Sequence, residues 1–132
     1  MHTSYLHIRC DEFAFLTATQ SIVEIIQLTP SADLTEIMWR NTRLSVYNLT
    51  KILLPDQKQI VNHNALIIKN SAEECVAIAV ESVASIESID ANSFHAIPSI
   101  QFRLKQFFDK VYINPSDNQC IYRLKIDSFT SD

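Results

Sequence analysis

The sequence of 132 residues contains no glycine, where average usage would give about nine. Phosphate-binding loops, dinucleotide-binding fingerprints, EF-hand loops and nucleophile elbows all need glycine where φ is positive or where the backbone approaches a ligand closely. None of these sites can exist here in standard form. Tight turns must instead use Asn or Asp, which tolerate the left-handed conformation better than other residues. The candidates are Asn41, the cluster Asn62–Asn64, Asn70 and Asp117–Asn118.

Cysteine and histidine are sparse and lack the spacing of a known site. The three cysteines, Cys10, Cys75 and Cys120, are odd in number and form no CxxC pair, so neither a disulfide framework nor a zinc knuckle is indicated. We interpret them as buried free thiols. The four histidines show no HxH or HxxxH spacing. We therefore expect no catalytic, cofactor-binding or metal-binding residues.

Long apolar stretches and runs of one charge are also missing. The formal net charge is -4 with both signs interspersed, and no basic run is visible, so nucleic acid is not an expected partner. The apolar stretches are short, as in Cys75–Val80, and far below the length of a membrane span. Met1–Cys10 lacks the apolar core of a signal peptide. We expect a cytoplasmic protein without direct membrane insertion.

What the sequence does contain is a series of short, β-rich segments. Hydrophobic residues make up 47% of the chain, enough for a core, and the length fits a single domain over residues 1–132. Alternation and dense β-branched residues predict roughly seven strands, as in a β-barrel or sandwich. The predicted strands lie in Tyr5–Arg9, Glu12–Leu16, Ser21–Leu28, Arg43–Leu49, Ala65–Lys69, Glu74–Glu81, Val111–Ile113 and Gln119–Ile126.

Other segments give weaker or different signals. Thr29–Ser31 contains a proline and is expected to end the strand before it, for which a short helix also stays open. Ser82–Ile89 mixes strand and turn character, and Ala91–Ser99 is expected to be a loop. Ile100–Lys110 has apolar residues at helical spacing, which favours a short helix or an irregular turn.

The segment Trp39–Leu49 (WRNTRLSVYNL) resembles the signature of CheW-like domains. That signature has an apolar pair, Arg-Gly, a short apolar strand with proline, and an ending of Asp-Leu. Arg40 stands at the Arg position, whereas Asn41, Ser45 and Asn48 stand where Gly, Pro and Asp are usual. Further segments resemble the family in the right order, so that the resemblance extends over almost the whole chain. They are Phe13–Phe15, Ile22–Ile26, Val76–Ile89 and Phe107–Ile126.

The resemblance implies both a fold and a function. The fold would be mainly β, with two intertwined small five-stranded SH3-like barrels, short helices and a hydrophobic groove between the barrels. The function would be that of a non-enzymatic scaffold without cofactors. Such a scaffold joins the regulatory domain of a CheA-like histidine kinase to the cytoplasmic tip of a chemoreceptor, in chemotaxis or pilus-motility signalling.

The resemblance also selects candidate partner-binding residues. It implies that Glu24 lies near Arg40, beside the groove that faces the receptor, and a planar guanidinium suits a carboxylate. We therefore select Glu24, Trp39, Arg40, Asn41 and Arg43. The Glu24–Arg40 pair can instead be an ordinary surface ion pair worth about 0–1 kcal/mol. Trp39 can belong to a core or to an interface, and both questions stay open.

Two other functions stay open at this point. Because Asn41, Ser45 and Asn48 depart from the signature, the chain can be a β-barrel interaction module that has lost receptor or kinase coupling and binds another regulatory partner. An enzyme in which Cys75 or Cys120 uses His95 as a base is the third hypothesis, although no spacing supports it.

Overall fold

The fold is built almost entirely from short strands. The computed structural model describes residues 2–10, 13–31, 35–49, 51, 61–98 and 102–130. Within these ranges it contains eleven strands, more than the roughly seven predicted. The strands are β1 (His2–Cys10), β2 (Phe13–Ala18), β3 (Ile22–Ser31), β4 (Glu36–Trp39), β5 (Thr42–Asn48), β6 (Asn62–Lys69), β7 (Cys75–Val80), β8 (Ser82–Asp90), β9 (Phe94–Ala96), β10 (Phe108–Ile113) and β11 (Cys120–Leu124). The helical turns are η1 (Thr19–Ser21), η2 (Ala91–Ser93), α2 (Phe102–Phe107) and η3 (Ile126–Ser128).

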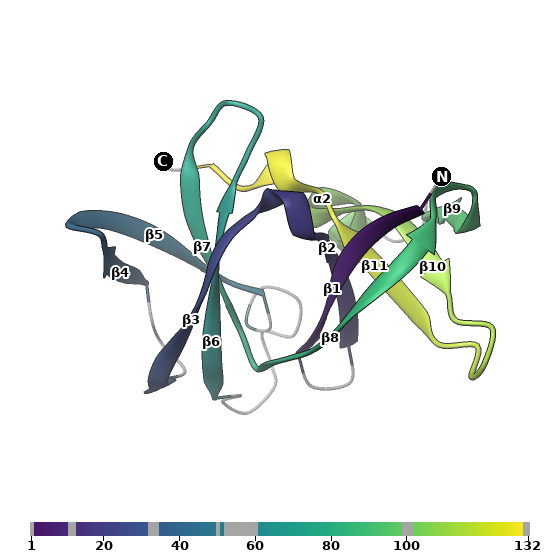
Figure 1. The fold of residues 1–132 in the computed structure, drawn as a ribbon, viewed down its shortest axis with the longest axis horizontal. Coiled ribbons are helices and arrows are strands. Elements are labelled where there is room, and N and C mark those ends of the chain that lie inside the picture. The colour runs from purple at the N-terminus through teal and green to yellow at the C-terminus, as the bar shows by residue number, and fades with distance from the viewer. Residues whose placement is uncertain are drawn as a thin grey trace.

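The strands form two sheets (Figure 1). One has six strands in the order β8-β1-β2-β11-β10-β9, and the other has five in the order β3-β6-β7-β5-β4. The chain begins the six-stranded sheet with β1 and β2, builds the whole five-stranded sheet, and then returns to complete the first with β8 to β11. The prediction of two small, intertwined β units is confirmed. The first unit has a sixth strand because the three-residue β9 pairs with β10.

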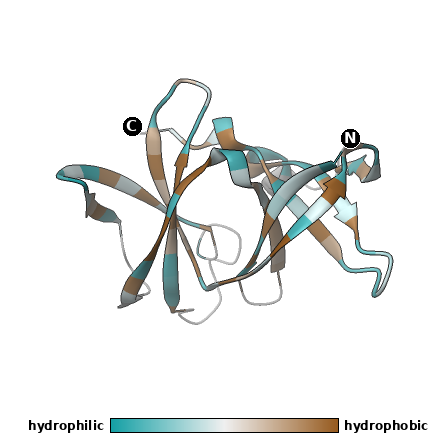
Figure 2. Ribbon diagram, in the orientation of Figure 1, coloured by the Kyte–Doolittle hydropathy of each residue, from teal (hydrophilic) through white to brown (hydrophobic). Residues whose placement is uncertain are grey.

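Strands β6 and β7 are buried on both faces. Alternate side chains of a strand point to opposite faces. Leu66 and Ile68 of β6 pack into a core shared by the two sheets, whereas Ile67 packs into the core of the five-stranded sheet alone. In β7 every side chain from Val76 to Val80 is fully buried. This explains why these strands are continuously apolar in sequence. Figure 2 shows hydrophobic residues along these strands and a hydrophilic turn between them.

The shared core joins the two sheets into one packed body. It contains large side chains from both: Leu6, Ile8, Phe15, Phe108, Val111 and Leu124 from the six-stranded sheet, and Leu66, Ile68, Val76, Ile78 and Val80 from the five-stranded sheet. The rings of Phe15 and Phe108 stack with their centroids 5.0 Å apart. A separate core around Leu16 and Ile121 belongs to the six-stranded sheet. The buried side chains of the described residues therefore form three cores, where a simple barrel has one.

The turns show how a chain without glycine reverses direction. Asn41 (φ 64°) and Asn118 (φ 58°) take the left-handed conformation, as predicted, but Arg40 (φ 48°) and Glu73 (φ 65°) do so as well. Asn70 has no positive φ. Its side-chain Oδ1 instead accepts hydrogen bonds from two backbone N–H groups of the β6–β7 turn, both at 3.0 Å.

Several segments differ from their predictions. The Asn62–Asn64 cluster is not a turn but the start of β6, because pairing with β3 and β7 outweighs its polar composition. Strand β3 continues through Thr29–Ser31 because it is an edge strand, where proline is tolerated, although its register shifts there. Ser82–Ile89 is a strand paired with β1, with one register shift, and Ala91–Ser99 contains η2 and β9. In Ile100–Lys110, the described part forms α2 and then enters β10.

The C-terminal segment, residues 125–130, fastens the two sheets together. Phe129 is fully buried in the shared core, with its ring 5.1 Å from that of Tyr47 and 5.5 Å from that of Phe107. Its backbone oxygen accepts a hydrogen bond of 2.9 Å from Asn70 Nδ2, and the Tyr47 hydroxyl donates to the Thr130 oxygen at 2.9 Å. The segment therefore combines apolar burial with satisfied backbone groups.

Asp127 anchors the same segment to the β6–β7 turn. Its carboxylate accepts 2.8 Å hydrogen bonds from both the backbone N–H and the hydroxyl of Ser71. The backbone bond is the larger cause, and together the two bonds lower the pKa of Asp127 below its ordinary value. The contact is therefore fully present above the ordinary aspartate pKa and is lost as the pH falls through the lowered pKa.

Phe129→Ala is expected to lower the free energy of unfolding by about 3–5 kcal/mol, because it removes a fully buried ring and leaves a cavity. Urea denaturation followed by circular dichroism measures the change. Ile113→Ala, at an exposed position on β10, serves as the control and should change the free energy by no more than about 0.5 kcal/mol. Equal effects of the two substitutions would contradict the assignment of Phe129 to the shared core.

Asn118→Val should destabilise the protein by about 1–2 kcal/mol, because a β-branched residue fits poorly at a positive φ. Asn118→Gly should leave the stability nearly unchanged or raise it, since glycine adopts this conformation without steric cost. Thermal unfolding of the two variants beside the parent tests this order. Equal stability of the valine and glycine variants would show that residue 118 does not need the left-handed conformation.

Candidate functional site

Glu24 connects the two edges of the five-stranded sheet. It lies on β3 opposite Ile67, while Trp39 and Arg40 lie at the end of β4, the strand at the other edge. The Glu24 Oε1 atom accepts a hydrogen bond from Trp39 Nε1 at 3.1 Å and another from Arg40 Nη2 at 3.1 Å. Side chains thus link the two edge strands. The expected proximity of Glu24 and Arg40 is confirmed.

Arg40 and Asn41 form the tip of a β-hairpin, and the turn geometry places Arg40. Trp39 of β4 pairs with Thr42 of β5, so only two residues connect the strands. Both have positive φ, as a two-residue type I′ turn requires. Arginine is an unusual residue for that conformation. The strained backbone conformation is therefore located at Arg40, which the resemblance to the family signature had already selected.

The indole of Trp39 supports the Arg40 guanidinium. The Arg40 Cζ atom lies 4.4 Å from the centre of the Trp39 ring, within the range of a cation–π contact. Trp39 itself is half-buried and packs against the core of the five-stranded sheet. The sequence left open whether Trp39 belongs to the core or to an exposed surface, and the structure shows both. One part of the ring packs against the core, and another part contacts the Arg40 guanidinium.

The solvent exposure of Arg40 and Glu24 determines how much their ion pair contributes to the stability of the fold. The Arg40 side chain is 65% exposed and that of Glu24 is 40% exposed. Exposed ion pairs contribute about 0–1 kcal/mol to stability, because water screens them and two side chains lose freedom. We therefore name Glu24, Trp39 and Arg40 the hairpin-tip cluster and attribute little of the fold's stability to it.

The remaining selected residues lie close in sequence but outside this cluster. Asn41 supplies the second turn position. Arg43 lies on β5 and pairs with Glu36 of β4 at 3.6 Å, and both side chains are mostly exposed. The structure thus brings three of the five candidates into direct contact. It gives Asn41 a backbone role and Arg43 a separate ion pair.

Exposed apolar residues lie next to the cluster in the sequence, and two of them, Val23 and Ile25, were not selected from the sequence. Val23 and Ile25, the neighbours of Glu24 on β3, are 40% and 41% exposed. Met38, which precedes Trp39 on β4, is 65% exposed. Alternation places Val23 and Ile25 on the face opposite Glu24, so the sequence alone indicated that they share one face of the strand. Their exposure also depends on β3 being an edge strand, which the sequence did not reveal.

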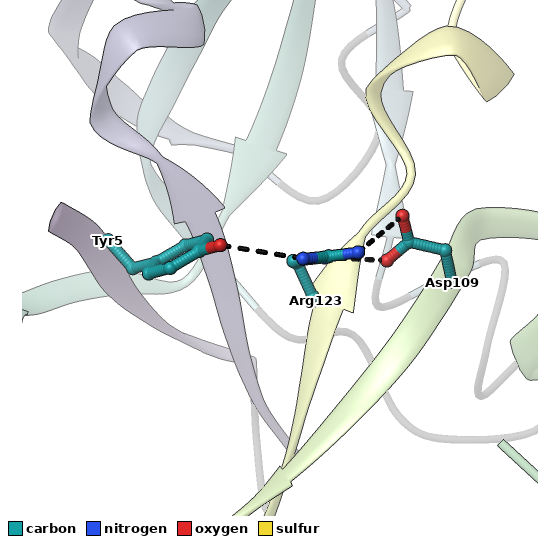
Figure 3. Close-up of polar contacts among 3 residues, drawn as sticks. All are labelled: Tyr5, Asp109 and Arg123. Carbon is teal, nitrogen blue, oxygen red and sulfur yellow. Dashed lines mark hydrogen bonds and ion pairs between the residues drawn. The ribbon is translucent and has the colours of Figure 1, made fainter. Parts of the chain in front are cut away.

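A second polar cluster lies in the six-stranded sheet and has no counterpart in the sequence analysis (Figure 3). Arg123 donates from Nε and Nη2 to the two carboxylate oxygens of Asp109, at 2.8 and 3.1 Å, and from Nη1 to the Tyr5 hydroxyl at 3.5 Å. Its guanidinium also lies 4.8 Å from the centre of the Phe94 ring. Burial opposes the charge of Arg123, but the bonds to Asp109 and Tyr5 outweigh it, and the pKa of Arg123 is raised.

Arg123 lines a cleft of about 810 Å³ that also receives residues from the β6–β7 turn of the other sheet. We call this the inter-sheet cleft. Its lining includes Gln20, Ser21, Lys69 and Lys125, but none of the hairpin-tip cluster. A volume of this size is typical of ligand sites.

The cysteines and histidines form no visible site. Cys10 is buried as predicted, but Cys75 is only partly buried and Cys120 is exposed, so the interpretation of all three as buried thiols is wrong for Cys120. Cys75 and His95 lie in different sheets. In the part of the chain that the structure describes, no cluster of His, Cys, Asp and Glu suits a metal ion. No helix there is long and apolar enough to cross a membrane.

Comparisons with known proteins agree with this architecture. The family model of the CheW-like domain matches residues 4–132, and the chain therefore belongs to the CheW-like domain family. A similar solved structure is the crystal structure of the scaffolding protein TtCheW from Thermoanaerobacter tengcongensis, with 16% sequence identity and a TM-score of 0.77. The match covers 95% of this chain and 90% of that chain, which establishes a CheW-like fold. No curated protein matches the sequence.

Arg40→Ala should shift the fluorescence emission of Trp39 to longer wavelength, because water replaces the guanidinium over the indole. Trp39 is the single tryptophan of the chain, so the emission reports this cluster alone. The free energy of unfolding should change by less than about 1 kcal/mol. Arg43→Ala, which lacks contact with the cluster, should leave the emission unchanged. If Arg40→Ala lowered the free energy of unfolding by several kcal/mol, the ion pair between Arg40 and Glu24 would instead be a major contributor to the stability of the fold.

Proposed function

We propose that this chain is a non-enzymatic coupling scaffold that joins a chemoreceptor-type sensor to a CheA-like histidine kinase. The mechanism is positional. The scaffold holds the regulatory domain of the kinase beside the cytoplasmic tip of the receptor, so that the state of the receptor biases kinase activity. Membership of the CheW-like family supports an adaptor in chemotaxis-type or pilus-motility signalling.

The hairpin-tip cluster is the observation that carries this proposal. Glu24 engages Arg40 through Nη2, and the side chain of Arg40 remains largely exposed. The guanidinium is thus held in place at one end by Glu24 and on one face by Trp39, with its remaining donors available to a partner. An arginine whose orientation is already fixed loses less freedom on binding. Arginine and tryptophan are also enriched among the residues that dominate protein interfaces.

The exposed apolar side chains of β3 suit the same role. Val23 and Ile25 adjoin Glu24 in the sequence of β3 but lie on its opposite face, so they form a separate exposed apolar surface at the same edge of the sheet. Interfaces commonly combine an apolar centre with a polar rim. A partner that contacts both faces of this edge strand would meet the apolar side chains on one face and the charged group on the other.

Two of the three departures from the family signature suit the local backbone geometry, and this favours retained coupling over the alternative of a module that has lost a partner. Asn41 stands at the usual glycine position and adopts φ 64°, the conformation for which glycine is suited. Asn48 stands at the usual aspartate position, and its Oδ1 accepts a hydrogen bond of 3.1 Å from the Lys51 backbone N–H. At these two positions the asparagines supply the turn conformation and an acceptor for a backbone N–H, and Ser45 lies within strand β5.

We also propose that residues 1–132 act as one domain, because the shared core draws side chains from both sheets. Neither sheet would retain its buried face alone. A cytoplasmic location belongs to the same proposal, since the kinase and the receptor tip act there.

Arg40→Ala should weaken capture of a receptor-tip fragment or of the kinase regulatory domain by about tenfold or more, as expected when an anchoring arginine is truncated. Pull-down and calorimetric titration with each partner measure the change. Arg9→Ala, an exposed arginine on the other sheet, is the control and should bind normally. Unchanged binding of both partners by Arg40→Ala would refute the role of the cluster, and failure of the parent chain to bind either partner would refute the coupling function.

A further inference from the structure

The six-stranded sheet leaves one long strand edge open, that of β8. This strand ends the sheet on one side, and β1 is its only partner among the described strands (Figure 1). Residues Ser85–Asp90 pair with β1 without interruption, and the one register shift of the ladder lies before them, between Val83 and Ser85. The backbone groups on the outer side of an edge strand form a row that a further extended chain can pair with. The opposite edge, β9, has only three residues.

The side chains of β8 do little to guard this edge. Proteins usually protect an edge strand with lysine, proline, a bulge or a very short length. β8 has nine residues, SVASIESID, with no lysine, arginine or proline, and its register shift lies near one end. Ala84 and Ser85 are exposed and small, so they leave the backbone beside them accessible. The Glu87 carboxylate lies 3.9 Å from His7 Nδ1, on the neighbouring strand of the same sheet.

Ile86 lies at the centre of the open edge. Its side chain is 67% exposed, which makes it the most exposed large hydrophobic side chain among the described residues. Its partner in the ladder, Leu6 of β1, is only 5% exposed. The apolar surface of Ile86 is therefore exposed because β8 has no further strand beside it, and a strand added there would bury it.

We propose that β8 pairs with the β8 of a second copy of this chain, antiparallel and about a two-fold axis at Ile86. This register places Ile86 beside the same residue of the second copy, Ser85 opposite Glu87, and Ala84 opposite Ser88. Isoleucine meets isoleucine, and no two like charges lie opposite each other. A foreign strand would need an apolar residue at the matching position, whereas a second copy supplies it by symmetry. The surface lies on the six-stranded sheet, separate from the hairpin-tip cluster on the other sheet.

Sedimentation velocity of the full chain over a range of concentrations tests the proposal. The average mass should rise from that of a monomer toward that of a dimer, and added salt should not weaken the association, because no ion pair crosses the axis. Ile86→Lys should raise the dissociation constant by about tenfold or more, since two cations would then lie opposite each other. Ile113→Lys makes the same change at an exposed isoleucine of β10, which has a strand on either side, and should associate as the parent does.

Hydrogen exchange locates the contact. At high protein concentration the amides of Ser85–Asp90 should exchange more slowly than at low concentration, while those of the β4–β5 hairpin should not change. A chain that stays monomeric at every concentration would overturn the proposal, as would equal effects of Ile86→Lys and Ile113→Lys. Arg40→Ala should leave self-association unchanged, so this contact and the proposed coupling function can fail separately. Circular dichroism confirms that each variant is folded.

Discussion

Burial of β6 and β7 on both faces is the constraint on which the rest of the structure depends. One face of this strand pair supplies the shared core, and the other supplies the core of the five-stranded sheet. Apolar burial is worth about 25 cal/mol per Å² and is the dominant favourable contribution to folding. Because the two central strands are enclosed in this way, β3 and β4 lie at the outer edges of their sheet. Polar side chains can reach solvent and partners there, and the hairpin-tip cluster lies at those edges.

The absence of glycine acts as a second constraint, and it is local. Every reversal must use a residue with a side chain, and four described residues take positive φ: Arg40, Asn41, Glu73 and Asn118. Asparagine tolerates this conformation, as the chemistry of its short side chain leads one to expect. Arginine and glutamate do not share that tolerance. Their turns form because the paired strands on either side fix the position of the ends.

Sequence reasoning predicted the elements whose signal is local and missed those that depend on distant partners. The continuous apolar runs of β6 and β7 and the strand of Thr42–Asn48 were recognisable from residue type alone. The strand character of Asn62–Asn64 was not, because it comes from pairing on both sides. The family signature drew attention to Glu24 and Arg40, sixteen residues apart. Arg123 and Tyr5 are 118 residues apart, and no local pattern connects them.

The energetics of the hairpin tip argue that its residues are kept for something other than stability. A non-glycine residue held in the left-handed region costs about 1–2 kcal/mol. The exposed ion pair between Arg40 and Glu24 returns about 0–1 kcal/mol, and the cation–π contact with Trp39 adds about 0.5–1 kcal/mol at an exposed site. The contacts thus roughly offset the strain and leave no clear gain to the isolated chain. Backbone strain of this kind concentrates at functional sites, where the surrounding structure enforces it. If the proposed function is right, acceptors supplied by a partner would satisfy the exposed donors of Arg40 and provide the free energy that the isolated hairpin tip lacks.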